Sequence, residues 1–167
     1  MLNTRLLVLS LLAAVLTAYA VQAGTLDDAP FRFAPPTKDW KIDDANLRQI
    51  GPGSYIAAML SNSNLNLTVA ILKTEMDSQT NAFDEFCGGA RNSLSRSHIK
   101  VLLDEPTTFL NFKARRFAYE LPRPGGFTNY NETVVFATPT TAWTISTIGL
   151  QNKTNDVRHA FQLFQKK

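Results

Sequence analysis

The chain has 167 residues, with 17 basic and 14 acidic side chains and a formal net charge of +3. A charge excess this small does not drive nucleic-acid binding by itself. The single cysteine, Cys87, excludes an internal disulfide. A fold of this length can be held by packing alone, without disulfides or metal ions.

Residues 1–23 have the pattern of an export signal. Arg5 supplies a positive charge, an apolar run follows from Leu6 to Leu16, and the small residue Ala23 precedes Gly24. The apolar run is too short to span a bilayer as a helix. We therefore expect cleavage between Ala23 and Gly24, and a single mature domain over residues 24–167. The mature protein is expected to be periplasmic or secreted, with no stable membrane insertion.

The first part of the mature chain reads as short strands and a hairpin. Strands are expected at 31–33 and 40–42, followed by a turn at 51–53. Residues 55–60 and 65–72 are then two strands joined by a polar loop, because apolar residues alternate in the second of them. Asn66 starts one of three glycosylation-type triplets, with Asn131 and Asn152. Its place inside a predicted strand argues against modification there.

Residues 81–97 change to a helical period. The apolar stripe consists of Phe83, Phe86, Cys87, Ala90 and Leu94. Gly88 and Gly89 are costly inside a helix, and a close approach of the helix to a sheet explains them. A ligand that approaches the backbone is the alternative explanation.

The second half of the chain is rich in strand-forming residues. Strands are expected at 99–103, 107–121, 130–138 and 141–149, with a long turn at 122–126. Asn155 can cap a closing helix, whose apolar stripe consists of Val157, Ala160, Phe161 and Phe164. Short connections between neighbouring strands favour an antiparallel sheet. The fold class is therefore α+β, mainly an antiparallel sheet with helices packed on its faces.

The segment Phe31-Arg32-Phe33-Ala34-Pro35-Pro36, followed by Trp40, resembles the opening of Mog1/PsbP-like proteins. The later order of hairpin, helix, strands and closing helix is similar too, over most of residues 31–165. This resemblance implies an α/β/α sandwich and an accessory or binding role without a shared enzyme mechanism. The Mog1/PsbP-like family includes exported bacterial proteins of unassigned role. No functional residue can be carried over, because no functional motif of the family is legible here.

No catalytic, metal or cofactor site is expected. Cys87 lies on the apolar helix stripe, and His98 is about 16 Å away if that helix continues. Cys87 is therefore interpreted as a buried small apolar side chain. There is no G-x-S-x-G motif, and the two histidines, His98 and His159, lack metal-ligand spacing. We expect a protein that is not an enzyme.

Four residues are the candidates for binding a partner. Lys113 and Arg115 fall on one face of a strand, and Arg123 and Phe127 lie in the loop that follows it. The predicted function is that of an exported, non-enzymatic accessory or binding protein whose partner is an envelope or extracellular protein. The alternative is a small-molecule or lipid carrier in the periplasm, with a cleft between sheet and helix.

Overall fold

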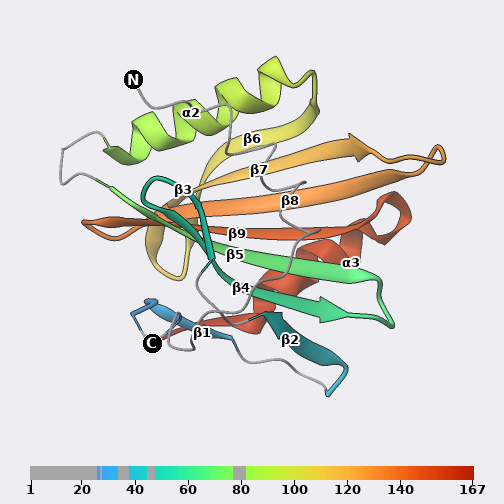
Figure 1. The fold of residues 1–167 in the computed structure, drawn as a ribbon, viewed down its shortest axis with the longest axis horizontal. Helices are drawn as coiled ribbons and strands as arrows, with labels where there is room; N and C mark the ends of the chain where they lie inside the picture. Colours follow the sequence, from blue (N-terminus) through green and yellow to red (C-terminus); the bar gives the residue numbers. More distant parts are fainter. Residues whose placement is uncertain (1–25, 27, 34–37, 45–47, 77–81) are drawn as a thin grey trace.

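A computed structural model describes residues 26, 28–33, 38–44, 48–76 and 82–167. The predicted signal peptide and its cleavage site lie outside the described residues. Eight strands form one sheet in the order β2-β4-β5-β9-β8-β7-β6, and β3 also pairs with β4 (Figure 1). Every pairing is antiparallel. The strands are β2 (Trp40–Asp44), β3 (Arg48–Gly51), β4 (Ser54–Asn62), β5 (Leu67–Glu75), β6 (Lys100–Phe109), β7 (Phe112–Pro122), β8 (Thr128–Ala137) and β9 (Thr141–Leu150).

Two α-helices and a two-stranded ribbon complete the described fold. The helices are α2 (Ala82–Arg96) and the short α3 (Thr154–His159), which lies between the 3-10 turns η1 (Gln151–Lys153) and η2 (Ala160–Leu163). The ribbon pairs β1 (Phe31–Phe33) with β10 (Phe164–Lys166). The mainly antiparallel sheet with two helices confirms the predicted α+β class, but not the finer expectation of an α/β/α sandwich. The second side of the sheet is covered by the short α3, the 3-10 turns and the ribbon, in place of a full helical layer.

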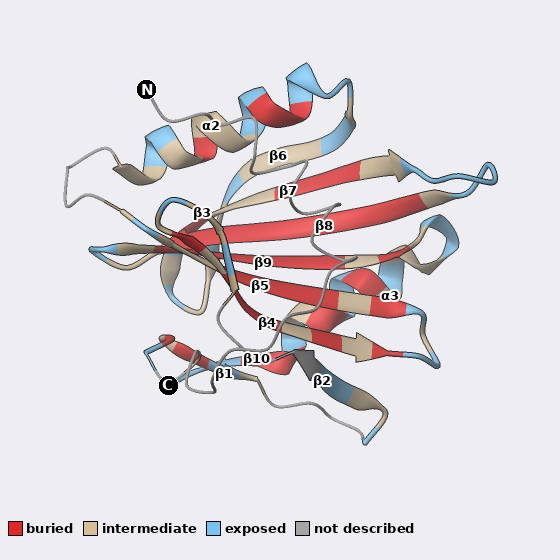
Figure 2. Cartoon of the chain, in the orientation of Figure 1, coloured by how far each residue is buried: buried red, intermediate tan, exposed pale blue. Residues whose placement is uncertain are grey.

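The two faces of the sheet are distinguished by the elements that pack on them. On one side, Phe117, Tyr119 and Val135 form a cluster with Cys87 and Leu94 of α2; we call this the α2 face. On the other side, the α3 face, the large side chains of the sheet pack against the ribbon and η2. The α3-face core contains Phe31, Leu60, Val69, Ile71, Val134, Phe136, Trp143, Ile145, Leu163 and Phe164. Buried residues run along the middle of β8, β9 and β5 (Figure 2).

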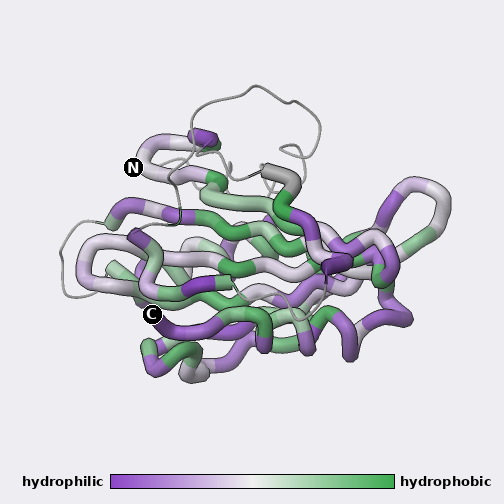
Figure 3. The backbone as a smooth tube through the Cα atoms, turned by 90° about the horizontal axis from the view of Figure 1, so that it is seen from below, coloured by the Kyte–Doolittle hydropathy of each residue, from purple (hydrophilic) through white to green (hydrophobic). Residues whose placement is uncertain are grey.

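Hydrophobic stretches of the chain gather along the strands, and the connecting loops are mainly hydrophilic (Figure 3). One connection was not predicted. Strand β6 runs through Asp104, Glu105 and Pro106 and ends at a two-residue turn, where Leu110 and Asn111 have φ values of 52° and 68°. A left-handed pair of this kind matches the twist of the strands it joins. The expected strand at 107–121 is therefore two strands of a hairpin.

The closing helix is shorter than predicted. Helix α3 ends at His159, and Phe164 lies in β10 opposite Phe33. No side chain caps the start of α3, so the expected cap at Asn155 is wrong; the Thr154 hydroxyl donates to the Gln151 carbonyl at 2.9 Å. Phe164 keeps its predicted apolar role, but it fills the core from a strand.

The expected close approach at Gly88 is also wrong, because a Cβ atom there would meet nothing within 4 Å. Gly88→Ala is therefore expected to raise the free energy of unfolding by up to about 1 kcal/mol, the helix-propensity difference between the two residues. Gly149→Ala is the matched opposite case. Its Cβ would lie 2.6 Å from Leu67 Cδ2 and 2.8 Å from Val157 Cγ2, so it should destabilise. Urea denaturation of both variants tests the pair; a loss of stability in Gly88→Ala would contradict it.

Candidate functional site

The two basic residues at the start of β7 bind acidic side chains of the same chain. Lys113 Nζ lies 3.0 Å from Asp84 Oδ1 in α2. Arg115 Nε lies 2.5 Å from Asp104 Oδ1 of β6, and Arg91 of α2 binds the other oxygen of that carboxylate at 2.5 Å. Both residues project from the α2 face, as strand alternation predicted. These ion pairs connect α2 to β6 and β7.

Asp104 is the centre of this arrangement. Partial burial alone would raise the pKa of the Asp104 carboxyl. Hydrogen bonds from Arg115 and Arg91 have the larger combined effect, so the pKa is lowered. Asp104 therefore remains charged between two guanidinium groups. Lys113 and Arg115 are not the free basic patch that the sequence suggested.

The other two predicted residues lie at the opposite end of β7. Arg123 and Phe127 bound the β7–β8 loop, and the Arg123 N–H donates to the Phe127 carbonyl at 2.8 Å. Gly125 and Gly126 have φ values of 86° and 79°, so the tight turn depends on glycine. At about 3.3 Å per residue, this loop is about 30 Å from Lys113. The four predicted residues thus form two separate pairs.

The loop pair differs from Lys113 and Arg115, which form ion pairs with the rest of the chain. The Phe127 side chain is 65% exposed, on a hairpin that extends beyond the neighbouring strands (Figure 1). Among the described residues, the Arg123 side chain has no ion-pair partner. An exposed aromatic side chain and an arginine in the same loop are typical of protein contact surfaces.

Two further apolar residues, not singled out from the sequence, lie at the same end of the sheet. Val101 and Leu102 of β6 are 40% and 44% exposed. Val101 pairs with Tyr119, about 10 Å along β7 from the start of the hairpin loop. The sequence pattern that could have predicted this exposure is the run Val101-Leu102-Leu103. Three apolar residues in succession cannot all face one side of a sheet. A register shift between Val101 and Leu103 accompanies the exposure. We call Val101, Leu102, Arg123 and Phe127 the hairpin-end surface.

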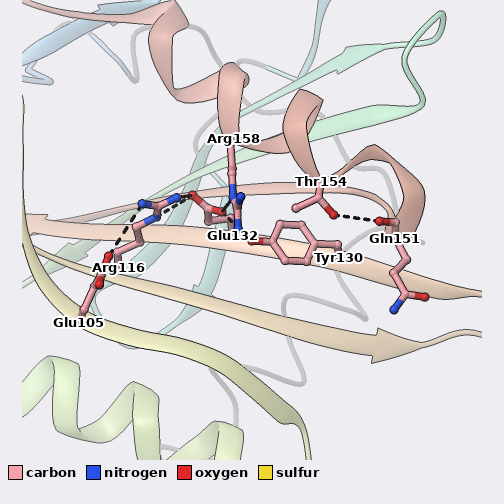
Figure 4. A network of polar contacts seen from close by, with 7 residues as sticks. All are labelled: Glu105, Arg116, Tyr130, Glu132, Gln151, Thr154 and Arg158. Carbon is pink, nitrogen blue, oxygen red and sulfur yellow. Dashed lines mark hydrogen bonds and ion pairs between the residues drawn. The ribbon is translucent and has the colours of Figure 1, made fainter.

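The most buried charge in the described structure is Glu132, in the middle of β8 and 1% exposed. Two nitrogen atoms of Arg116 in β7 contact the Oε1 atom of Glu132. Nε donates a hydrogen bond at 2.7 Å, and Nη2 lies 2.5 Å away. The Tyr130 hydroxyl donates to Oε2 at 2.8 Å, and Arg158 Nε of α3 lies 3.4 Å from the same oxygen (Figure 4).

This network joins separate elements on the α3 face. Arg116 also lies 3.9 Å from Glu105 of β6, so the chain of contacts runs through β6, β7, β8 and α3. Burial raises the pKa of Tyr130, and its hydrogen bond to Glu132 adds to the rise, so the phenol stays protonated as a donor. Both oxygens of the Glu132 carboxylate are therefore occupied by donors from Arg116, Tyr130 and Arg158. The arrangement anchors α3 to the sheet.

Cys87 is a buried thiol, as predicted. Burial raises its pKa to about 11, so the thiolate is scarce at neutral pH and nucleophilic chemistry is disfavoured. Within the described ranges, no group of three or more His, Cys, Asp or Glu side chains is placed to hold a metal ion.

The three glycosylation-type triplets differ in exposure. Asn131 is fully buried, whereas Asn66 and Asn152 are exposed. Asn66 lies in the β4–β5 turn with a φ of 54°, so its predicted place inside a strand is wrong. Across the described part of the chain, no helix combines the length and apolar character that a membrane span requires.

Comparison with known proteins identifies the fold. No protein-family model and no curated protein sequence matches the chain. Among solved structures, cyanobacterial PsbP (CyanoP) from Synechocystis superposes with a TM-score of 0.61 at 11% identity, over 92% of this chain and 99% of that one. LpqN of Mycobacterium tuberculosis, described as involved in cell envelope biogenesis, gives 0.50 at 13% identity, over 81% and 82%.

A Bacteroides thetaiotaomicron protein gives a TM-score of 0.52 at 12% identity, over 83% of this chain and 46% of that one. Identities this low establish the fold alone. The chain therefore has a PsbP-like fold, and the resemblance read from the sequence is confirmed at that level.

Proposed function

We propose that the protein is an exported, non-catalytic accessory protein that binds another protein of the cell envelope or the extracellular space. The hairpin-end surface is the proposed contact. The observation that carries the proposal is the 65% exposure of Phe127, in the loop of a hairpin that reaches past the neighbouring strands (Figure 1). The aromatic ring is exposed to water there, and its burial by a partner would stabilise the complex.

The chemistry of the surface defines the partner. Val101, Leu102 and Phe127 offer apolar area, and Arg123 offers a positive charge without an internal partner among the described residues. The complementary surface is an apolar pocket with an acidic group at its rim. The fold shared with LpqN, a protein involved in cell envelope biogenesis, supports a role in that compartment. The inert Cys87 thiol and the fully bound Glu132 carboxylate support a role without catalysis.

The test is affinity capture from the native envelope fraction, with the tagged protein after its export. Wild type is expected to recover one stoichiometric partner, and Phe127→Ser is expected to lose it. Ile42→Ser is the matched control, because Ile42 of β2 is 60% exposed at the opposite edge of the sheet. Both variants should unfold at the wild-type temperature, since both side chains face water. Recovery of the partner by Phe127→Ser, or failure of wild type to recover one, would overturn the proposal.

A further inference from the structure

Helix α2 contains glycine residues where a helix is weakened by them. Gly88 and Gly89 lie in the interior of the helix, where glycine lowers the helical propensity of the chain. A Cβ atom at Gly88 would meet nothing within 4 Å, so close packing does not require glycine at this position. The chain therefore keeps a residue at Gly88 that lowers the stability of α2 without improving its packing.

The C-terminal end of α2 lacks glycine at the one position where glycine would help. The Ile99 N–H donates to the Leu94 carbonyl, and the His98 N–H donates to the Ser95 carbonyl, both at 3.1 Å. These two hydrogen bonds form a Schellman motif, which ends the helix with a residue in the left-handed conformation. That residue is His98, with a φ of 53°. A side chain at positive φ is sterically unfavourable, so this end of the helix is also less stable than it could be.

The contacts that hold α2 against the sheet are limited. The helix has 15 residues, and its buried residues are Cys87, Ser93 and Leu94. The ion pairs that connect it to β6 and β7 use Asp84 and Arg91, whose side chains are 66% and 50% exposed. Solvent and salt screen such pairs, so they contribute little stability. In contrast, the residues of β8 are buried along almost the whole strand.

We propose that α2 is a lid, which opens as a unit while the sheet stays folded and uncovers Phe117, Tyr119 and Val135. The parts of a protein that move are drawn from the least stable elements of its fold. The strand order of the sheet is continuous from β2 to β6 without α2, and the large core side chains pack on the α3 face. The sheet can therefore persist when the helix leaves. Opening exposes an apolar surface that the closed protein buries.

The test uses Cys87 as a reporter, because it is the single cysteine of the chain and is buried while α2 is closed. Alkylation of the purified protein by iodoacetamide, followed by mass spectrometry, measures how often the thiol becomes accessible. The wild-type rate is expected to exceed, by about tenfold or more, the rate that global unfolding allows; urea denaturation supplies that reference. Gly88→Ala is expected to slow alkylation by about fivefold, because alanine stabilises the closed helix.

Ile71→Val is the matched control, because it weakens the fold away from α2. Ile71 is fully buried in the core on the α3 face, so loss of one methylene group lowers global stability. If α2 opens alone, alkylation of this variant should stay within about twofold of wild type; if the thiol reacts only in the unfolded chain, alkylation should rise by about fivefold. A rise in Ile71→Val, a wild-type rate no faster than global unfolding allows, or an unchanged rate in Gly88→Ala would each show that α2 does not open on its own.

Discussion

Arg116→Met is expected to lower the free energy of unfolding by about 3 kcal/mol, because it removes the principal counter-charge of a buried carboxylate. Glu132 is 1% exposed, and both of its short charged contacts come from Arg116. Methionine keeps most of the side-chain volume, so the loss reports the charge and the hydrogen bonds. Urea denaturation at neutral pH measures it.

Two further variants show whether the uncompensated carboxylate is the cause. Arg158→Met removes a guanidinium that is half exposed and 3.4 Å from Glu132, so we expect a smaller loss of about 1 kcal/mol. Arg116→Met combined with Glu132→Leu removes both charges and should be more stable than Arg116→Met alone. A double variant no more stable than the single one would contradict this explanation.

The elements that the sequence predicted well are those with a clear period. The alternation over 65–72 and the helical stripe of 81–97 appear as β5 and α2, because burial of one face selects the secondary structure directly. The turn at Leu110 and Asn111 was missed because Leu110 is an uncommon residue at positive φ. At the C-terminus, pairing of Phe164 with Phe33 outweighed a local helical pattern, since a contact between distant parts of the chain leaves no local signal.

The candidate sites were less predictable for the same reason. Lys113 and Arg115 looked like a free basic patch because Asp84 and Asp104 become their partners only after α2 and β6 fold beside β7. Glu132 was read only as the middle of a glycosylation-type triplet, although a carboxylate inside an apolar strand is itself a signal of a buried ion pair. Arg123 and Phe127 remain candidates because a hairpin loop keeps its own residues exposed.

The hairpin-end surface uses a part of the fold that its stability does not require. The core on the α3 face and the Glu132 network hold β1, β10 and α3 to the sheet. The hairpin-end surface contributes exposed side chains instead. Variants of the hairpin-end surface should therefore change binding while stability stays near wild type, and core variants should do the reverse.

Phe31→Ala is the core variant with the largest expected effect, a loss of about 3–5 kcal/mol in the free energy of unfolding. The Phe31 ring is 1% exposed and makes edge contacts with Trp143, Phe164 and Phe136, at centroid distances of 5.3, 5.6 and 5.9 Å. Truncation leaves a cavity where β1, β10 and the sheet meet, and it removes three favourable ring contacts.

The matched control is Phe127→Ala, which deletes the same ring from a 65% exposed position and should change stability by no more than about 0.5 kcal/mol. Urea denaturation of both variants separates the two roles of phenylalanine in this chain. A loss below about 1 kcal/mol for Phe31→Ala would mean that the β1–β10 ribbon is not part of the cooperative core. The expected large loss means that the sheet depends on a strand near the start of the described chain, so truncation past Phe31 should unfold the protein.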